Sequence, residues 1–101
     1  MTVAAVIQAR MGSTRFPGKV AAHLDGRPVL AHVVDRARRA RCVDRVVVAT
    51  TTKDRDDTIV EVATALGVDH VRGPEDDVLR RMVIAADHAG ATVVVRITAD
   101  C

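Results

Sequence analysis

The stretch RVVVATTTKDRDDTIVEVATALGVDHVRG, residues 45–73, combines two apolar runs with an amphipathic segment between them. Residues 45–51 are rich in valine and threonine, which favours a strand. The acidic pair at 56–57 can cap a helix whose apolar positions recur at helical spacing up to Gly67, a residue typical of helix ends. Residues 68–73 then predict a short second strand. A strand, a helix and another strand in this order predict a right-handed crossover between parallel strands.

The same alternation continues on both sides of this stretch. Residues 3–9 form a short apolar run that predicts a strand buried on both faces, and residues 91–99 predict the most hydrophobic strand. Pro28 can begin one helix, and the acidic pair at 76–77 can begin another that runs to Gly90. The residues expected to face the core are Val29, Leu30, Val33, Val34 and Ala37 on the former and Val78, Leu79, Met82, Val83 and Ala86 on the latter. Together these elements predict an α/β fold, a Rossmann-like three-layer αβα arrangement with a mostly parallel sheet.

The composition limits what such a domain can bind. The chain has 101 residues, of which 49% are hydrophobic, and this suits one small domain. It contains no Trp or Tyr and a single Phe, so the base-stacking surfaces of single-strand nucleic-acid binders are not expected. A net charge of +2 creates no field that would attract nucleic acid or an anionic membrane. Any anion site must therefore be local.

Neither a targeting signal nor a disulfide framework is recognisable. The apolar run near the start is much shorter than the roughly 20 residues of a membrane span, and it lacks the basic region of a signal peptide. Cys42 and Cys101 follow no metal-ligand spacing, and neither do the four histidines. We therefore expect a cytoplasmic protein without disulfides.

Polar loops follow each of the predicted strands. They span residues 10–19, 50–57, 72–77 and 98–100. Because the carboxyl ends of parallel strands lie at one edge of a sheet, where such sheets bind ligands, we expect these loops to converge on one crevice. Four acidic residues within them precede helical patterns and are expected to be N-caps rather than ligands: Asp56, Asp57, Asp76 and Asp77.

The loop after the first strand carries the strongest functional signal. Its sequence, ARMGSTRFPGK at 9–19, places three cations and two hydroxyl groups among glycines. The spacing is not that of a P-loop, because five residues separate Gly12 from Gly18 and Val20 follows Lys19. The GxGxxG pattern of dinucleotide-binding domains is also absent. Backbone N–H groups, hydroxyls and cations together suit a triphosphate.

Strings along the whole chain resemble the cytidylyltransferase family that activates acidic sugars as CMP-sugars. They are IQARMGSTRFPGK at 7–19, GRPVLAHVVDRARRA at 26–40, VVVATT at 46–51, RGPEDDVLRRM at 72–82 and VVRITADC at 94–101. The 3-deoxy-manno-octulosonate and acylneuraminate cytidylyltransferases look like close relatives, and the bacterial branch named for spore-coat polysaccharide biosynthesis protein F looks nearest. The resemblance implies a fold of the nucleotide-diphospho-sugar transferase type. It also implies transfer of CMP from CTP to a sugar hydroxyl, with release of pyrophosphate, for polysaccharide biosynthesis.

The resemblance also implies roles for individual residues. Those assigned to nucleotide binding are Gln8, Ala9, Arg10, Gly12, Ser13, Arg15, Lys19, Ala49 and Thr50. Those assigned to catalysis are Arg10 and Lys19, which would hold the triphosphate, and Asp100, which would hold Mg²⁺. Weaker candidates for the edge of the crevice are Asp76, Asp77 and Arg80.

The chain departs from the family pattern in two ways. Phe16 stands where the family usually has leucine, which is a conservative change. In the family a proline usually follows the Asp-Cys pair, and a second half supplies the acceptor pocket, another metal-binding acid and much of the homodimer contact, whereas this sequence ends at Cys101. We therefore expect residues 1–101 to be the nucleotide-binding half, inactive alone, with the apolar strand 93–97 left uncovered.

Two alternative classes remain open at this point. The first is a sugar-1-phosphate nucleotidyltransferase, which also has a glycine-rich start, although Gln8-Ala9-Arg10 stands where that family has paired glycines. The second is a noncatalytic nucleotide-binding module, for which CTP would bind without turnover. The sequence does not identify the sugar acceptor, because acceptor selection would belong to the other half of the enzyme.

Overall fold

A computed structural model describes residues 1–12, 23–24 and 26–99 of the chain. Its centre is a parallel four-stranded sheet with the strand order β5-β4-β1-β6. The strands are β1 (Val3–Gln8), β4 (Arg45–Thr51), β5 (Asp69–Gly73) and β6 (Val93–Thr98). A separate antiparallel ribbon, which the sequence pattern does not predict, pairs β2 (His23–Leu24) with β3 (Arg27–Pro28).

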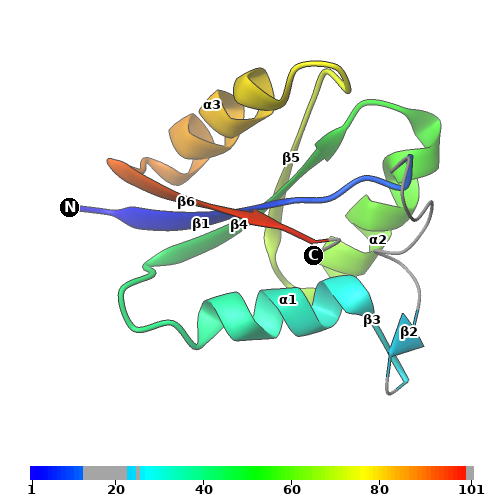
Figure 1. Ribbon diagram of the computed structural model, residues 1–101, viewed down its shortest axis with the longest axis horizontal. Coiled ribbons are helices and arrows are strands. Elements are labelled where there is room, and N and C mark those ends of the chain that lie inside the picture. Colours follow the sequence, from blue (N-terminus) through cyan, green and yellow to red (C-terminus); the bar gives the residue numbers. More distant parts are fainter. Residues whose placement is uncertain (13–22, 25, 100–101) are drawn as a thin grey trace.

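Helices cover both faces of the sheet, as predicted. They are α1 (Val29–Arg38), α2 (Asp57–Leu66), which follows the short 3₁₀ helix η2 (Asp54–Asp56), and α3 (Val78–Ala89). In Figure 1, α1 and α2 lie on one side of the strands and α3 lies on the other, which gives three layers. Gly67 and Gly90 follow α2 and α3 with φ of 68° and 63°, a left-handed conformation that glycine adopts without steric cost.

The alternation of side chains along β1 builds two cores. Ala5 and Ile7 are fully buried in the cluster that includes residues of α1 and α2, whereas Ala4 and Val6 are fully buried in the cluster that includes residues of α3. Successive strand residues point to opposite faces, so one strand serves both layers. The prediction of a first strand buried on both faces is confirmed.

The predicted inward face of α3 is correct only in part, because Met82 packs against the core cluster on this side of the sheet but three other predicted residues do not. Leu79 is 74% exposed, and Val78 and Val83 are also exposed, whereas the buried residues of the helix are Arg81, Ala85 and Ala89. Alanine side chains allow the helix to lie close to the sheet, where Ala85 and Ala89 pack in the same cluster as Ala4 and Ala49. Larger apolar residues on this face would hold the helix away from the sheet.

A pair of substitutions tests this orientation of α3. Leu79→Lys is expected to change the free energy of unfolding by less than about 0.5 kcal/mol, because the side chain is exposed. Ala85→Leu is expected to lower it by about 1–3 kcal/mol through overpacking. Urea unfolding followed by circular dichroism measures both, and the reverse order of effects would contradict this orientation of the helix.

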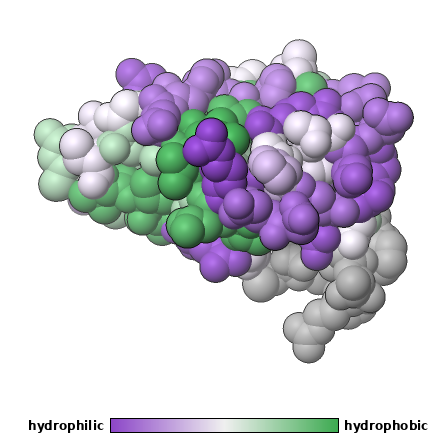
Figure 2. All heavy atoms as spheres, turned by 90° about the horizontal axis from the view of Figure 1, so that it is seen from above, coloured by the Kyte–Doolittle hydropathy of each residue, from purple (hydrophilic) through white to green (hydrophobic). Residues whose placement is uncertain are grey.

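Strand β6 forms one edge of the sheet and leaves apolar side chains exposed. Val93, Val94 and Val95 are 40%, 37% and 40% exposed, respectively. Figure 2 shows apolar side chains gathered on one part of the surface, among polar ones. The expectation that this strand is left uncovered is confirmed for the described residues. Among those residues, no helix combines the length and apolar character that crossing a membrane requires.

Candidate functional site

The order of the strands places a topological switch point between β1 and β6. Helices α1 and α2 lead the chain from β1 to β4 and then to β5 on one face, and α3 returns it across the other face to β6. At the carboxyl ends of the two strands, Gln8 pairs with Thr98. Ligands of doubly wound sheets bind outside the carboxyl ends of the strands at such a point. A ligand site is therefore expected at the switch point.

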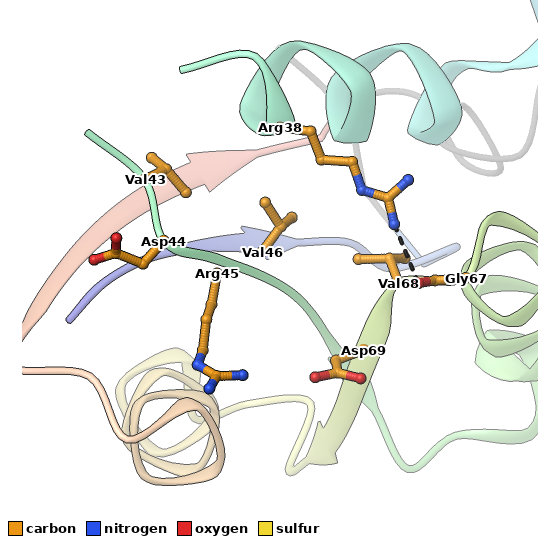
Figure 3. Close-up of a pocket in the computed structure, with 8 residues that line it drawn as sticks. All are labelled: Arg38, Val43, Asp44, Arg45, Val46, Gly67, Val68 and Asp69. Carbon is orange, nitrogen blue, oxygen red and sulfur yellow. Dashed lines mark hydrogen bonds between the residues drawn. The ribbon is translucent and has the colours of Figure 1, made fainter. Parts of the chain in front are cut away.

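One hollow lies away from the switch point, at the amino ends of the strands. Its volume is about 290 Å³, and it is lined by residues near the start of β4 and β5, among them Asp44, Arg45 and Asp69 (Figure 3). Arg38 crosses it to donate hydrogen bonds to the carbonyl oxygens of Leu66 and Gly67 at 3.3 and 3.1 Å. These bonds satisfy carbonyls at the end of α2, and we assign this hollow a structural role.

The cavity at the switch point is smaller and rich in arginine. Its volume is about 190 Å³, and it is lined by Gln8, Ala9, Arg10, Val78, Arg81, Arg96 and Thr98. In strand register, Gln8 and Thr98 are neighbours, as are Val6 and Arg96, so these side chains share the face of the sheet that α3 covers. Three arginines line this cavity, which favours an anionic ligand.

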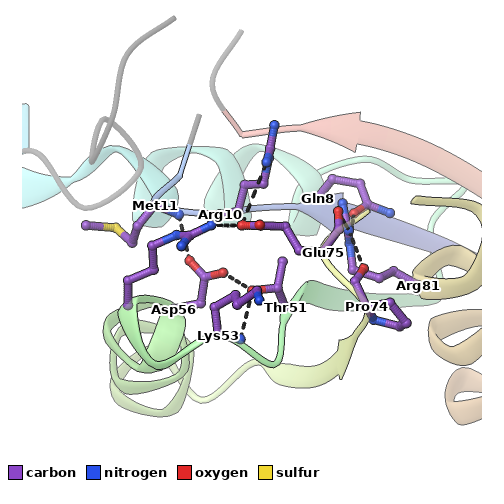
Figure 4. Close-up of polar contacts among 10 residues, drawn as sticks. Gln8, Arg10, Met11, Thr51, Lys53, Asp56, Pro74, Glu75 and Arg81 are labelled. Carbon is purple, nitrogen blue, oxygen red and sulfur yellow. Dashed lines mark hydrogen bonds and ion pairs between the residues drawn. The ribbon is translucent and has the colours of Figure 1, made fainter. Parts of the chain in front are cut away.

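Gln8 and Arg81 form a buried pair beside this cavity. Arg81 is only 4% exposed, and its Nε donates to Oε1 of Gln8 at 3.0 Å (Figure 4). Its Nη1 donates to the carbonyl oxygens of Pro74 and Glu75, each at 2.8 Å. Burial, followed by the nearby charge of Arg10, lowers the pKa of Arg81 from its usual value. Arginine remains charged at neutral pH even so.

The sequence pattern pointed to the neighbouring residue instead of Arg81. Arg80 is exposed and does not line the cavity, and its backbone N–H donates to the carboxylate of Asp77 at 2.9 Å. Asp77 is therefore an N-cap, as predicted. Which of two adjacent arginines turns inward depends on the rotation of α3 about its axis, and that rotation follows from the packing of its alanines against the sheet.

Charged side chains also join three of the loops. Glu75, after β5, forms an ion pair with Arg10, after β1, with 3.9 Å between Oε2 and Nη1. The same carboxylate pairs with Arg55 in η2. A methyl group added at Gly12 would lie 2.7 Å from the guanidinium of Arg55, so the backbone and this side chain approach closely. The prediction that these loops converge is confirmed for their described parts.

Asp56 was predicted to be an N-cap, and its observed role is different. It occupies the position before α2, yet its side chain does not cap that helix. The carboxylate is fully buried and accepts hydrogen bonds from the backbone N–H of Met11, at 2.7 Å, and from the hydroxyl of Thr51 (Figure 4). It thereby ties the start of the first loop to the end of β4. The neighbouring Asp57 does not cap either, because it begins α2 and pairs with Arg72 at 2.8 Å.

Arg72 holds the second loop in place. Its Nε donates to the carbonyl oxygen of Thr51 at 2.7 Å, and its Nη2 donates to that of Lys53 at 2.9 Å. Arginine supplies five donors in a rigid planar fork, so one side chain can satisfy several carbonyls together with Asp57. Nothing in the local sequence marks this role, because its partners lie about 20 residues earlier in the chain.

The remaining predicted site residues are placed as follows. Ala9 is 5% exposed, and its backbone N–H donates to the carbonyl oxygen of Ala49 at 3.0 Å. Ala49 and Thr50 are fully buried within β4, and the hydroxyl of Thr50 has no hydrogen-bond partner among the described residues. Four further predicted residues lie outside the described residues: Ser13, Arg15, Lys19 and Asp100.

This fold and this site define a doubly wound α/β protein with an arginine-lined cavity at its switch point. The chain belongs to the cytidylyltransferase family, whose sequence model matches residues 4–101. The resemblance stated above is thereby confirmed, as is the α/β fold class.

Individual relatives agree with this assignment. A cytidylyltransferase from Leptospira borgpetersenii has a solved structure that matches all of this chain with a TM-score of 0.93 and 39% identity. The structure of a CMP:2-keto-3-deoxy-manno-octonic acid synthetase, determined in complex with CTP, matches 98% of the chain with a TM-score of 0.80 and 27% identity. The 3-deoxy-manno-octulosonate cytidylyltransferase of Geobacter sulfurreducens is 37% identical over 99% of the chain.

The relatives are considerably longer than this chain. It spans 39% of the length of the Geobacter protein and 42% and 40% of the two solved chains.

Proposed function

We propose that this protein acts in the transfer of CMP from CTP to a sugar hydroxyl, with release of pyrophosphate. Membership of the cytidylyltransferase family supports the reaction class. The observation that carries the proposal is the cavity at the switch point, where Arg10, Arg81 and Arg96 surround a buried amide. This chain would supply the part that binds the nucleotide.

In the proposed reaction, a sugar hydroxyl oxygen attacks the α-phosphorus of CTP. The new oxygen–phosphorus bond forms as the bond to the bridging oxygen of the β-phosphate breaks, and pyrophosphate leaves while the hydroxyl proton passes to solvent or a base. Cations stabilise the charge that develops on the phosphate oxygens. We assign this role to Arg10, Arg15 and Lys19, with Gly12 and Ser13 as further donors.

We also propose Mg²⁺ as the cofactor, with Asp100 as its protein ligand. The described carboxylates near the cavity are already engaged, since Glu75 pairs with two arginines and Asp56 accepts from Met11 and Thr51. Asp100 follows Thr98, which lines the cavity, by two residues. One carboxylate together with phosphate oxygens and water is a donor set that Mg²⁺ accepts. When bound, the ion would neutralise phosphate charge.

The acceptor is proposed only as a class. A sugar acid such as the 2-keto-3-deoxy-manno-octonic acid in the name of one relative is a reasonable candidate. A role in surface or spore-coat polysaccharide biosynthesis and assembly as a homodimer follow from the same resemblance and are part of the proposal.

The proposal predicts which nucleotide stabilises the protein. CTP with Mg²⁺ is expected to raise the melting temperature more than ATP or GTP does at the same concentration, because a ligand that binds only the native state stabilises it. Differential scanning fluorimetry measures the three shifts. Equal shifts with all three nucleotides would contradict a cytidine site.

A further inference from the structure

The carboxylate of Glu75 lies where the loops after β1, β4 and β5 meet. Its Oε2 forms an ion pair with the guanidinium of Arg55, in η2, and lies 3.9 Å from Nη1 of Arg10 (Figure 4). This oxygen is buried, so a ligand does not reach it. Any effect of Oε2 on ligand binding therefore acts through the two arginines.

The position of Glu75 is set from two sides. Nη1 of Arg81 donates to the carbonyl oxygens of Pro74 and Glu75, each at 2.8 Å, and Arg81 is itself only 4% exposed. These bonds tie the backbone of the loop to α3. Arg55 holds the other end of Glu75 through the ion pair with its carboxylate. Glu75 thus presents a negative charge at a well-defined place.

Arg10, in contrast, has a physical reason to turn away from the switch-point cavity. Its side chain is 39% exposed, and it lines the cavity together with Arg81 and Arg96. Burial lowers the pKa of Arg81, and the positive charges of Arg10 and Arg96 lower it further, which shows that the cations repel one another. Among the described residues, the ion pair of Arg10 is with Glu75, and this pair opposes the repulsion.

The separation of 3.9 Å allows Arg10 to bind a ligand at the same time. It exceeds the length of a hydrogen bond, so Glu75 attracts the guanidinium without occupying its donors. The five N–H donors of arginine form a planar fork that suits a phosphate group. A long side chain that is ordered before the ligand arrives loses less conformational entropy on binding.

We propose that Glu75 is a positioning residue that holds Arg10 at the switch-point cavity for the phosphates of the nucleotide. This inference rests on the proposed function, in which Arg10 binds the triphosphate. It gives an acidic side chain a favourable effect on the binding of an anion, which is the opposite of the effect of its charge alone.

Glu75→Asp separates position from charge. It keeps the negative charge but shortens the side chain by one methylene group, which lengthens a separation that is already 3.9 Å. The affinity for CTP, measured by isothermal titration calorimetry, is expected to fall about three- to fivefold, the range of a partly exposed ion pair. Glu75→Gln keeps the length but removes the charge, and a similar fall is expected.

The two variants give opposite results if Glu75 acts only through net charge. In that case Glu75→Asp would leave the affinity unchanged and Glu75→Gln would strengthen CTP binding, and the positioning role would be overturned. Glu61→Gln is the matched control, because it removes one negative charge from an exposed position of α2 and is expected to leave the affinity unchanged. Either Glu75 variant gives the test if the other does not fold.

Nuclear magnetic resonance tests the position of Arg10 without any nucleotide. The order parameter of its Nε–H bond reports motion of the side chain, and the signal is identified by its loss in Arg10→Lys. We expect this order parameter to fall in both Glu75 variants and to stay at the wild-type value in Glu61→Gln. An unchanged order parameter in the Glu75 variants would overturn the inference, whatever their affinity for CTP.

Arg55→Met tests the other partner of Glu75. It removes one restraint on Glu75 and leaves the hydrogen bonds from Arg81, so it is expected to weaken CTP binding less than Glu75→Asp does. An equal loss in Arg55→Met, with Arg10 still ordered, would assign the effect to Arg55 and overturn the role of Arg10.

The outcomes separate this inference from the function on which it rests. A wild type that binds CTP, with Glu75 variants that bind it equally well, would overturn the positioning role and leave the proposed function intact. A folded wild type that binds no CTP would overturn both.

Discussion

Replacing Asp56 with alanine is expected to lower the free energy of unfolding by about 2–4 kcal/mol. The carboxylate is fully buried and accepts from the N–H of Met11 and the hydroxyl of Thr51. Without it, both donors lose a charged acceptor in a place that water reaches poorly. Urea unfolding monitored by circular dichroism gives the change in free energy.

The same substitution is expected to weaken the binding of CTP. The hydrogen bonds of Asp56 connect the end of β4 to the start of the proposed phosphate loop. Asp57→Ala is the matched control, since its carboxylate is the adjacent one but is exposed and pairs with Arg72 at the surface. Asp57→Ala is expected to lower the free energy of unfolding by less than about 1 kcal/mol. Equal losses of unfolding free energy for Asp56→Ala and Asp57→Ala would show that the burial of Asp56 adds nothing to its contribution to stability.

Lys19→Ala is expected to weaken CTP binding by about 1.5–3 kcal/mol, which is roughly a 10- to 150-fold loss of affinity. In the proposed function this lysine makes a charge-assisted contact with the triphosphate, and a lysine in a loop predicted from the sequence is expected to add little to the core. The melting temperature without nucleotide is therefore expected to stay close to that of the wild type. Calorimetric titration with CTP and scanning fluorimetry provide the two measurements.

Arg45→Ala is the control for net charge. Arg45 is exposed at the first position of β4, at the end of the strand that lies away from the switch point. Its replacement by alanine removes the same single positive charge. CTP affinity is expected to change little. The phosphate role of Lys19 is wrong if Arg45→Ala weakens CTP binding as much as Lys19→Ala does. It is also wrong if Lys19→Ala unfolds the protein but leaves the affinity for CTP unchanged.

The order and type of the main elements could be predicted because they depend on local chemistry. The strand at 45–51 coincides with β4, and the helix ends predicted at Gly67 and Gly90 coincide with the left-handed residues that follow α2 and α3. Apolar runs between turn residues and helical spacing of apolar residues are properties of short segments. The parallel crossover then follows from chirality, which is the same for all such units.

The candidate site could be predicted only in part. The family strings place Gln8, Ala9 and Arg10 at the end of the first strand, and in the structure all three line the switch-point cavity. Their partners could not be found in this way, because Arg81 lies 73 residues from Gln8 and Asp56 lies 45 residues from Met11. Neither pairing leaves a pattern in the local sequence.

The sequence by itself determined the α/β class, the alternation of elements and the family, because propensity, periodicity and motif spacing are written within short stretches. On α1, the predicted inward residues Leu30, Val34 and Ala37 are buried. On α3, only the tertiary structure decided which side chains face inward. On α3 the apolar residues Val78, Leu79 and Val83 stay exposed, and Arg81 is buried instead. The physical reason is that a helix rotates to suit its whole interface. Close packing of Ala85 and Ala89 on the sheet, with hydrogen bonds that satisfy a buried guanidinium, outweighs the exposure of three larger apolar side chains.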